Sequence, residues 1–203
     1  GRARALAEAN DVPVIPGTEG PTSADEAEAF YAALPDGAAM MIKAISGGGG
    51  RGTRAVTGAD AVASTFERCR SEALAAFGNG DVYVERLVRR ARHIEVQILG
   101  DGSAVSQFGE RECSVQRRYQ KIVEVAPAPA LDADLRDAII GAAVRLARAA
   151  GYRSLGTFEF LVDMDATGPA SGRFFFIEAN ARLQVEHTVT EMVTGVDLVQ
   201  AQL

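Results

Sequence analysis

Polar side chains occur at every second position in the stretch 177–187, which reads I-E-A-N-A-R-L-Q-V-E-H. The apolar run before it, 174–177, is typical of a buried strand. Side chains of an extended chain alternate between two faces, so the polar set is expected to share one face. The set comprises Glu178, Asn180, Arg182, Gln184 and Glu186. Burying these groups unpaired is costly, so the pattern favours a surface that faces a cation and a charged ligand, with a solvent-exposed strand face as the alternative.

A further carboxylate, Glu159, lies on a strand predicted over residues 156–162. It alternates with Phe158 and Phe160, so it is expected to face away from the core. If the strands of Glu159 and Glu178 pair, their carboxylates repel each other unless a cation lies between them. With the amide of Asn180 they offer hard oxygen ligands, which suit Mg²⁺ or Mn²⁺.

A run of consecutive glycines, 47–50, separates a strand predicted over 39–44 from a return strand at 54–56. The backbone N–H groups of such a loop can approach a phosphate closely, and Lys43 lies just before it. The stretch is not a P-loop, because no Gly-Lys-Ser/Thr closes it. We interpret it as a phosphate-binding lid, with a flexible linker as the alternative.

The segment 111–121 is rich in charge, and its cations Arg117, Arg118 and Lys121 lie in a protein of net charge −6. The overall charge argues against a general nucleic-acid binder, and a few cations without more aromatic residues are weak evidence for a nucleic-acid patch. A small polyanion fits the segment better. Together with the lid, its lysine and the acidic platform, this predicts a nucleoside triphosphate and phosphoryl transfer.

The elements that must position these residues mix helices with strand hairpins. Helical periodicity is clear over 60–77 and 132–149, and strands are predicted over 82–88, 93–99 and 104–110. The expected class is therefore α+β with a largely antiparallel sheet. We expect three regions: 1–38 as linker and start, 39–126 with the glycine-rich lid, and 127–203 with the acidic metal platform.

Composition narrows the class of protein further. The 203 residues are 47% hydrophobic, yet no apolar stretch approaches the ~20 residues that span a bilayer. Cys69 and Cys113 are far apart and form no C-x-x-C pair, which suits a reducing, cytoplasmic location and argues against a zinc site. The sequence does not begin with Met, and residues 1–10 are expected to be a helix cut from a longer protein.

At this point the motifs resemble those of biotin carboxylases, the ATP-grasp components of biotin-dependent carboxylases. The matching stretches span nearly the whole chain: 43–52, 92–97, 110–118, 157–160 and 178–187. The last of these, together with the Gln-Arg-Arg-x-Gln-Lys segment at 116–121, is far more specific than the glycine loop alone. The resemblance implies an ATP-grasp fold: two lobes with mostly antiparallel sheets and a glycine-rich lid.

The resemblance also implies a reaction. In that family ATP and bicarbonate form carboxyphosphate, whose carbon dioxide passes to the ureido nitrogen of biotin on a carrier. The nucleotide-binding residues it implies are Lys43, Gly48, Gly49, Gly50, Glu85, Arg86, Val88, His93, Gln116 and Tyr119. The metal ligands it implies are Glu159, Glu178 and Asn180.

The resemblance also implies a set of bicarbonate-binding residues, some of which are catalytic. The resemblance implies that Lys121, Arg182, Gln184 and Val185 hold it. Glu186 would be the general base that deprotonates it, and Arg182 would also steady the developing biotin enolate. The implied partners are a biotin carboxyl carrier domain and a carboxyltransferase, in a homo-oligomeric enzyme, with neither nucleic acid nor membrane involved.

Some features depart from the family. Tyr119 stands where a histidine is usual, and Arg86 where a lysine is common, which puts nucleotide affinity or choice in question. The N-terminal Rossmann-like part and a C-terminal active-site arginine of the full module have no counterpart in this sequence, so we expect this chain alone to be inactive or nearly so. A carbamoyl-phosphate synthetase-like ligase core and a non-catalytic nucleotide-sensing module are the alternatives, and the final acyl acceptor is open.

Overall fold

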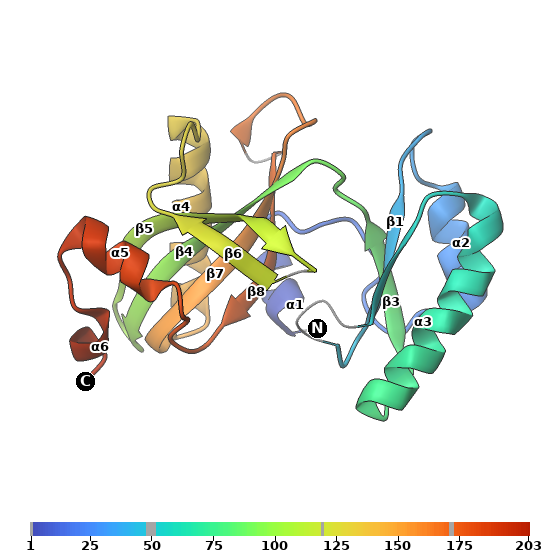
Figure 1. Ribbon diagram of the computed structural model, residues 1–203, viewed down its shortest axis with the longest axis horizontal. Helices are drawn as coiled ribbons and strands as arrows, with labels where there is room; N and C mark the ends of the chain where they lie inside the picture. Colours follow the sequence, from blue (N-terminus) through green and yellow to red (C-terminus); the bar gives the residue numbers. More distant parts are fainter. Residues whose placement is uncertain (1, 48–51, 119, 171–172) are drawn as a thin grey trace. The chain divides into compact units, whose positions relative to one another are not determined.

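The computed structural model describes residues 2–47, 52–118, 120–170 and 173–203 (Figure 1). The chain divides into two compact units, residues 15–89 and residues 2–14 with 90–203. The three predicted regions, 1–38, 39–126 and 127–203, differ from these units because they follow expected binding roles. They stay a prediction. Among the described residues no helix has both the length and the apolar character that crossing a bilayer requires.

The first unit is a three-stranded antiparallel sheet, in the order β2-β1-β3, with helices on one side (Figure 1). Its buried residues include Ala27, Ile42, Phe66 and Val84, contributed by both helices and the sheet. Its elements are α2 (Ala24–Ala32), β1 (Met40–Ala44), β2 (Thr53–Val56), a 3₁₀ turn (Ala59–Ala61), α3 (Val62–Phe77) and β3 (Val82–Arg86).

Local sequence signals set the ends of these helices. Ser23 and Glu26 form a reciprocal capping box at the start of α2, as their spacing predicts. Gly78 ends α3 with φ of 71°, a left-handed conformation that glycine adopts without a steric penalty. Cys69 is fully buried in the apolar stripe of α3, so it is a core residue.

The second unit is a five-stranded antiparallel sheet in the order β6-β5-β4-β7-β8. Its strands are β4 (Ala91–Asp101), β5 (Val105–Arg117), β6 (Gln120–Val125), β7 (Arg153–Asp163) and β8 (Phe174–Asn180). Its helices are α1 (Arg2–Glu8), α4 (Ala133–Ala149), α5 (His187–Thr194) and α6 (Leu198–Ala201).

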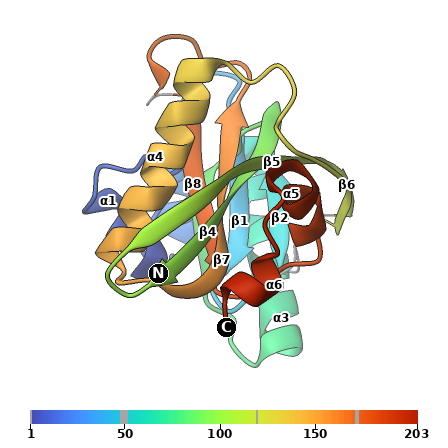
Figure 2. The same cartoon turned by 90° about the vertical axis from the view of Figure 1, so that its left-hand side faces the viewer.

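The long helix α4 packs on one face of this sheet, and the apolar core lies between them (Figure 2). On β4 that face carries Ile94, Val96 and Ile98, all fully buried. The alternate residues, His93 and Glu95, face the other side, as the period of two predicts. The same strand therefore supplies both the hydrophobic core and a polar face.

One prediction of local structure was wrong. The five polar residues from 178 to 186 do not share one extended face, because β8 ends at Asn180 and the following residues form turns that lead into α5. Between residues 12 and 16 the chain forms a single bridge, between Val14 and Phe176. The α+β class with antiparallel sheets is confirmed in both units.

Phe160 offers a test of this core. Its side chain is fully buried, and its ring lies 5.7 Å from the ring centroids of both Phe174 and Phe176. We expect Phe160→Ala to lower the free energy of unfolding by about 3–5 kcal/mol, measured by urea denaturation, because it leaves a cavity among packed aromatic rings. The control Leu74→Ala, at a side chain 59% exposed on α3, should cost less than about 1 kcal/mol; equal losses would contradict the assignment of Phe160 to the core.

Candidate functional site

Charged residues lie directly opposite one another on the sheet face away from α4. Glu95 on β4 is in register with Arg111 on β5 and with Glu159 on β7. Glu159 is in turn in register with Glu178 on β8, as the sequence predicts for these two carboxylates. Like charges directly opposite each other destabilise a sheet, so this row requires cations to stabilise it.

Lys121 on β6 provides one such cation. Its Nζ makes a short contact with Glu95 and lies 3.0 Å from Glu159 Oε1 and 2.7 Å from Glu186 Oε1. Burial lowers the pKa of Lys121, but the charges of Glu95 and Glu159 outweigh burial and raise it above its ordinary value. Lys121 therefore stays charged and ties three carboxylates from three different elements together.

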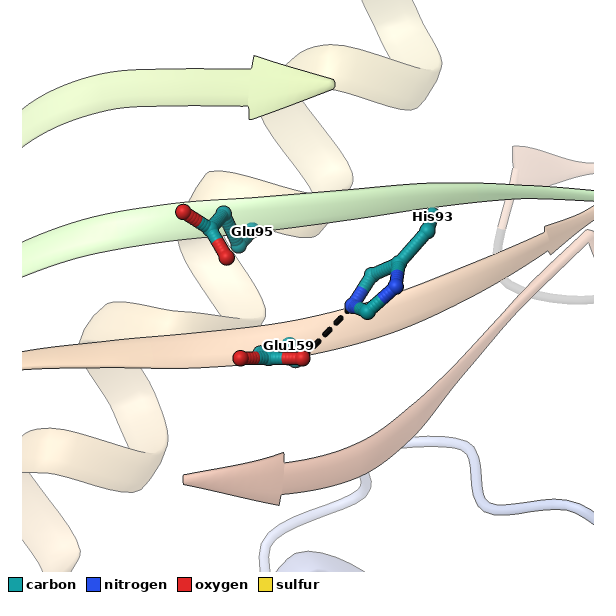
Figure 3. Close-up of side chains that lie close together, drawn as sticks. All are labelled: His93, Glu95 and Glu159. Atoms are coloured by element: carbon teal, nitrogen blue, oxygen red, sulfur yellow. Dashed lines mark hydrogen bonds and ion pairs between the residues drawn. The ribbon is translucent and has the colours of Figure 1, made fainter. Parts of the chain in front are cut away.

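His93 holds Glu159 from the neighbouring strand (Figure 3). Its Nε2 lies 2.6 Å from Glu159 Oε2, and its Nδ1 lies 2.7 Å from Gln116 Nε2. Gln116 Nε2 also donates to the carbonyl of Cys113 at 2.8 Å, which marks it as the amide nitrogen. The assigned network thus makes Nδ1 an acceptor and leaves Nε2–H to donate to the carboxylate.

Glu159 is the most heavily partnered carboxylate of the cluster. Besides His93 and Lys121, it accepts hydrogen bonds from Asn180 Nδ2 at 2.8 Å and Gln184 Nε2 at 3.2 Å. Burial raises the pKa of Glu159, but the hydrogen bond from His93 and the charge of Lys121 outweigh burial and lower it to about 2. Glu159 is therefore ionised at neutral pH although it is only 2% exposed.

Glu186 approaches the cluster from the start of α5, where it is the N-cap residue. It is 8% exposed. Burial raises its pKa, but the hydrogen bond from Lys121 outweighs burial and lowers it below its ordinary value. The positive end of the helix dipole acts in the same direction. Glu186 is thus an ionised carboxylate beside an ammonium group.

The residues around Glu186 divide into buried and exposed members. Gln184 is buried, and its side-chain oxygen accepts a short hydrogen bond from Thr157. Arg182 is exposed and donates to the carbonyl of Leu183 at 3.2 Å, and Val185 is 90% exposed. The polar pattern grouped Arg182 with the cluster and the family resemblance added Val185, but among the described residues no hydrogen bond or ion pair joins either to its carboxylates.

The predicted metal ligands fit a hard divalent cation in their chemistry. Glu159 and Glu178 are opposite each other, and Asn180 is on the same strand as Glu178. Asn180 donates its Nδ2 to both carboxylates, at 2.8 and 3.3 Å, so its amide must turn over before its oxygen can bind a metal. A second donor set, His93, Glu95 and Glu159, has ligand atoms within 4.8 Å of one another.

The first unit holds its own part of the predicted set. Lys43 on β1 and Glu85 on β3 form a short ion pair, with side chains 27% and 9% exposed. Arg86 ends β3, and Val88 follows it, largely buried. Gly48, Gly49, Gly50 and Tyr119 lie outside the described residues, so the lid prediction is not tested.

Sequence reasoning did not assign a role to two members of the charged row. Glu95 and Arg111 are both fully buried, and Arg111 Nε donates to Glu95 Oε1 at 2.6 Å. The phase of Glu95 with His93 on one strand was a usable signal. For Arg111 the sequence held no local signal, because its partner is on another strand.

The depressed pKa of Glu159 generates a prediction about acid stability. A carboxyl whose pKa falls from 4.5 to about 2 on folding contributes stability above pH 4.5, which is lost as the pH falls towards 2. We expect the free energy of unfolding of Glu159→Gln, measured by urea denaturation, to decline less than that of the wild type between about pH 5 and pH 3. Glu28→Gln, at an exposed site on α2, is the control. Parallel declines in wild type and Glu159→Gln would contradict the assignment.

Comparison with known proteins shows which family and which relatives this chain is similar to. Residues 1–203 match the family described as carbamoyl-phosphate synthase L chain, ATP binding domain. The chain is 56% identical to Pyruvate carboxylase 1 of Caenorhabditis elegans over 195 residues and 52% identical to pyruvate carboxylase of Bacillus subtilis over 205 residues, covering 95% and 100% of this chain. It spans only 16% and 17% of those relatives.

Solved structures agree with the sequence relatives. A biotin carboxylase complex with a β,γ-ATP ligand from Campylobacter jejuni matches with a TM-score of 0.88 at 42% identity, over 99% of this chain and 44% of that one. The biotin carboxylase domain of Hydrogenobacter thermophilus 2-oxoglutarate carboxylase, solved with MgADP and bicarbonate, matches with a TM-score of 0.88 at 40% identity, over 99% and 43%. These matches confirm the predicted ATP-grasp fold and the resemblance to biotin carboxylases. The chain belongs to the family of the carbamoyl-phosphate synthase L chain ATP-binding domain.

Proposed function

We propose that the protein containing this chain carboxylates carrier-bound biotin with bicarbonate and ATP, and that this chain is its ATP-binding core. The observation that carries the proposal is the contact of Lys121 with Glu186 and Glu159 at 2.7 and 3.0 Å, within motifs spaced as in biotin carboxylases. The pyruvate carboxylases and biotin carboxylase domains among its relatives support the same activity. A mere nucleotide binder has no need of an ionised carboxylate paired in this way.

We assign the ATP phosphates to Lys43 and to the glycines Gly48, Gly49 and Gly50 by their motif. Glu85, Arg86 and Val88 are assigned to the adenine by the same likeness. His93 and Gln116 are assigned to the nucleotide sugar, and Tyr119 to the nucleotide. Glu159, Glu178 and Asn180 would hold Mg²⁺ or Mn²⁺, which would offset the charge of the phosphate oxygens.

The chemistry of bicarbonate is assigned to the carboxylate and cations near α5. Glu186 accepts the bicarbonate proton, and the resulting anion attacks the terminal phosphorus of ATP to form carboxyphosphate and ADP. Lys121 and Arg182 stabilise the anions, while Gln184 and Val185 hold the bicarbonate. The lowered pKa of Glu186 keeps the base unprotonated at neutral pH.

The partners and final acceptor of the complete protein are part of this proposal. A biotin carboxyl carrier domain brings biotin to the site, and a carboxyltransferase passes the carboxyl group on, in a homo-oligomeric enzyme. Pyruvate is the first acceptor to test, because the sequence relatives named above are pyruvate carboxylases. The free thiols Cys69 and Cys113 support a cytoplasmic location, although one relative is named mitochondrial.

The name of the matching family supports a second candidate, a carbamoyl-phosphate synthase-like ligase. Both reactions begin by activating bicarbonate with ATP, so they share the base and the metal platform. Free biotin should stimulate ATP cleavage only in a biotin carboxylase, whereas ammonia should do so in a carbamoyl-phosphate synthase. The relatives named above are pyruvate carboxylases and biotin carboxylases, which favours the biotin carboxylase reaction.

Glu186→Gln tests the proposed base in the complete polypeptide that contains this chain. We expect bicarbonate-dependent ATP cleavage to fall at least about 100-fold, because the amide cannot take the proton. The Kd for MgATP, measured by calorimetry, should change less than about twofold, since Glu186 is not assigned to the nucleotide. Unchanged turnover in this variant, together with no stimulation of ATP cleavage by biotin, would contradict the proposal.

The chain of 203 residues by itself should show little or no turnover, because it spans only 16% and 17% of the pyruvate carboxylases named above. The measurement is release of phosphate from MgATP with and without bicarbonate. Robust bicarbonate-dependent release by this chain alone would contradict the expectation.

A further inference from the structure

We propose that Arg111 is a positioning residue for Glu186. It acts through two routes, one by way of Glu95 and Lys121 and the other by way of Thr190 on α5. The catalytic role in this inference rests on the proposed function, whereas the contacts themselves are observed in the structure. Arg111 touches no residue assigned to ATP or metal through a hydrogen bond among the described residues.

Arg111 is the junction of three elements. Its side chain is fully buried on β5. Its Nε donates to Glu95 Oε1 at 2.6 Å, and its Nη1 donates to Gln97 Oε1 at 2.9 Å and to Thr190 Oγ1 at 2.7 Å. A planar guanidinium with several donors in a fixed geometry fixes its acceptors in direction as well as distance.

The first route to Glu186 is a chain of charges. Glu95 gives one carboxylate oxygen to Arg111 and the other to Lys121. Arg111 thereby fixes the plane of the Glu95 carboxylate, and this plane sets where Lys121 Nζ lies. Lys121 in turn lies 2.7 Å from Glu186 Oε1. Replacing the guanidinium by an ammonium group keeps the charge but removes the fixed donor geometry, so the Glu95 carboxylate can turn and shift Lys121 away from Glu186.

The second route is the helix. Thr190 is one turn beyond Glu186 on α5 and is 1% exposed. Its hydroxyl accepts from Arg111, so the hydrogen bond joins the first turn of α5 to β5. Glu186, as N-cap, moves with that turn. Both routes therefore start at Arg111 and end at the same carboxylate.

Stability alone does not account for this arrangement. A buried ion pair is weak evidence for stability, because desolvation of its charges offsets much of their attraction. The other face of the same sheet offers a comparison in Arg136, whose side chain is 32% exposed and whose Nε donates to Glu110 Oε1 at 2.8 Å. That pair joins α4 to β5 and has no described contact with Lys121 or α5.

The experiment compares Arg111→Lys with Arg136→Lys in the complete polypeptide. We expect Arg111→Lys to lower kcat for bicarbonate-dependent ATP cleavage by about 10- to 100-fold with KM for MgATP within about twofold, because misplacing a reacting group weakens the chemical step. Arg136→Lys should leave kcat within about twofold even if it lowers Tm. In a Lys121→Met background, Arg111→Lys should lower kcat by a smaller factor than it does in the wild type, because the route through Lys121 is already lost and only the helix route remains.

A second pair of variants tests the helix route even where Arg111→Lys does not fold. Thr190→Val removes the acceptor at nearly constant shape, and Thr190→Ser keeps it. We expect Thr190→Val to lower kcat and to speed amide hydrogen exchange in α5, with Thr190→Ser close to wild type in both.

The outcomes separate the inference from the proposed function. Equal kcat values for Arg111→Lys and Arg136→Lys, full additivity with Lys121→Met, or Thr190→Val matching Thr190→Ser would each overturn the inference. If the wild type shows no bicarbonate-dependent cleavage, the proposed function fails. Hydrogen exchange then decides the positioning role: faster exchange in α5 of Thr190→Val but not of Arg136→Lys supports it, and equal exchange overturns it.

Discussion

The structure of the second unit depends on how it accommodates two carboxylates directly opposite each other in a sheet. Glu95 and Glu159 are buried and in register on β4 and β7. Two negative charges on directly opposite residues of neighbouring strands repel by several kcal/mol in a protein interior unless cations intervene. Arg111 forms an ion pair with one carboxylate oxygen of Glu95, and Lys121 forms ion pairs with both Glu95 and Glu159. The pairing of β6 with β5 brings Lys121 to both carboxylates.

The two faces of the sheet separate stability from chemistry. On β4, Ile94 and Val96 face α4 and build the apolar core, while Glu95 between them faces the charged cluster. A step of one residue changes the environment completely because the side-chain period of a strand is two. Rigid strands therefore hold the reactive groups in fixed positions, which is what a site needs in order to act without reorganising.

Much of this arrangement follows from local sequence. The α+β class, the capping box of Ser23, the stop at Gly78 and the alternation of β4 are all short-range signals, and the structure confirms them. The pairing of Glu159 with Glu178 was predictable because β7 and β8 are consecutive strands of the chain. The alternation beyond residue 180 failed because the turn into α5, packed against β5, overrides the local extended pattern. Arg111 was missed because its acceptors lie on β4 and α5, and no local period encodes contacts across strands.

The charge of the cluster bears on what it can bind. Four carboxylates converge on this face, from Glu95, Glu159, Glu178 and Glu186, against the two cations Lys121 and Arg111. Among the described residues of the cluster, the four carboxylates outnumber the lysine and arginine by two, which is the charge of one divalent cation. A cation between Glu159 and Glu178 would therefore neutralise the site without displacing Lys121 from Glu186. The metal platform and the proposed base can thus share one cluster, because the ammonium group separates their charges.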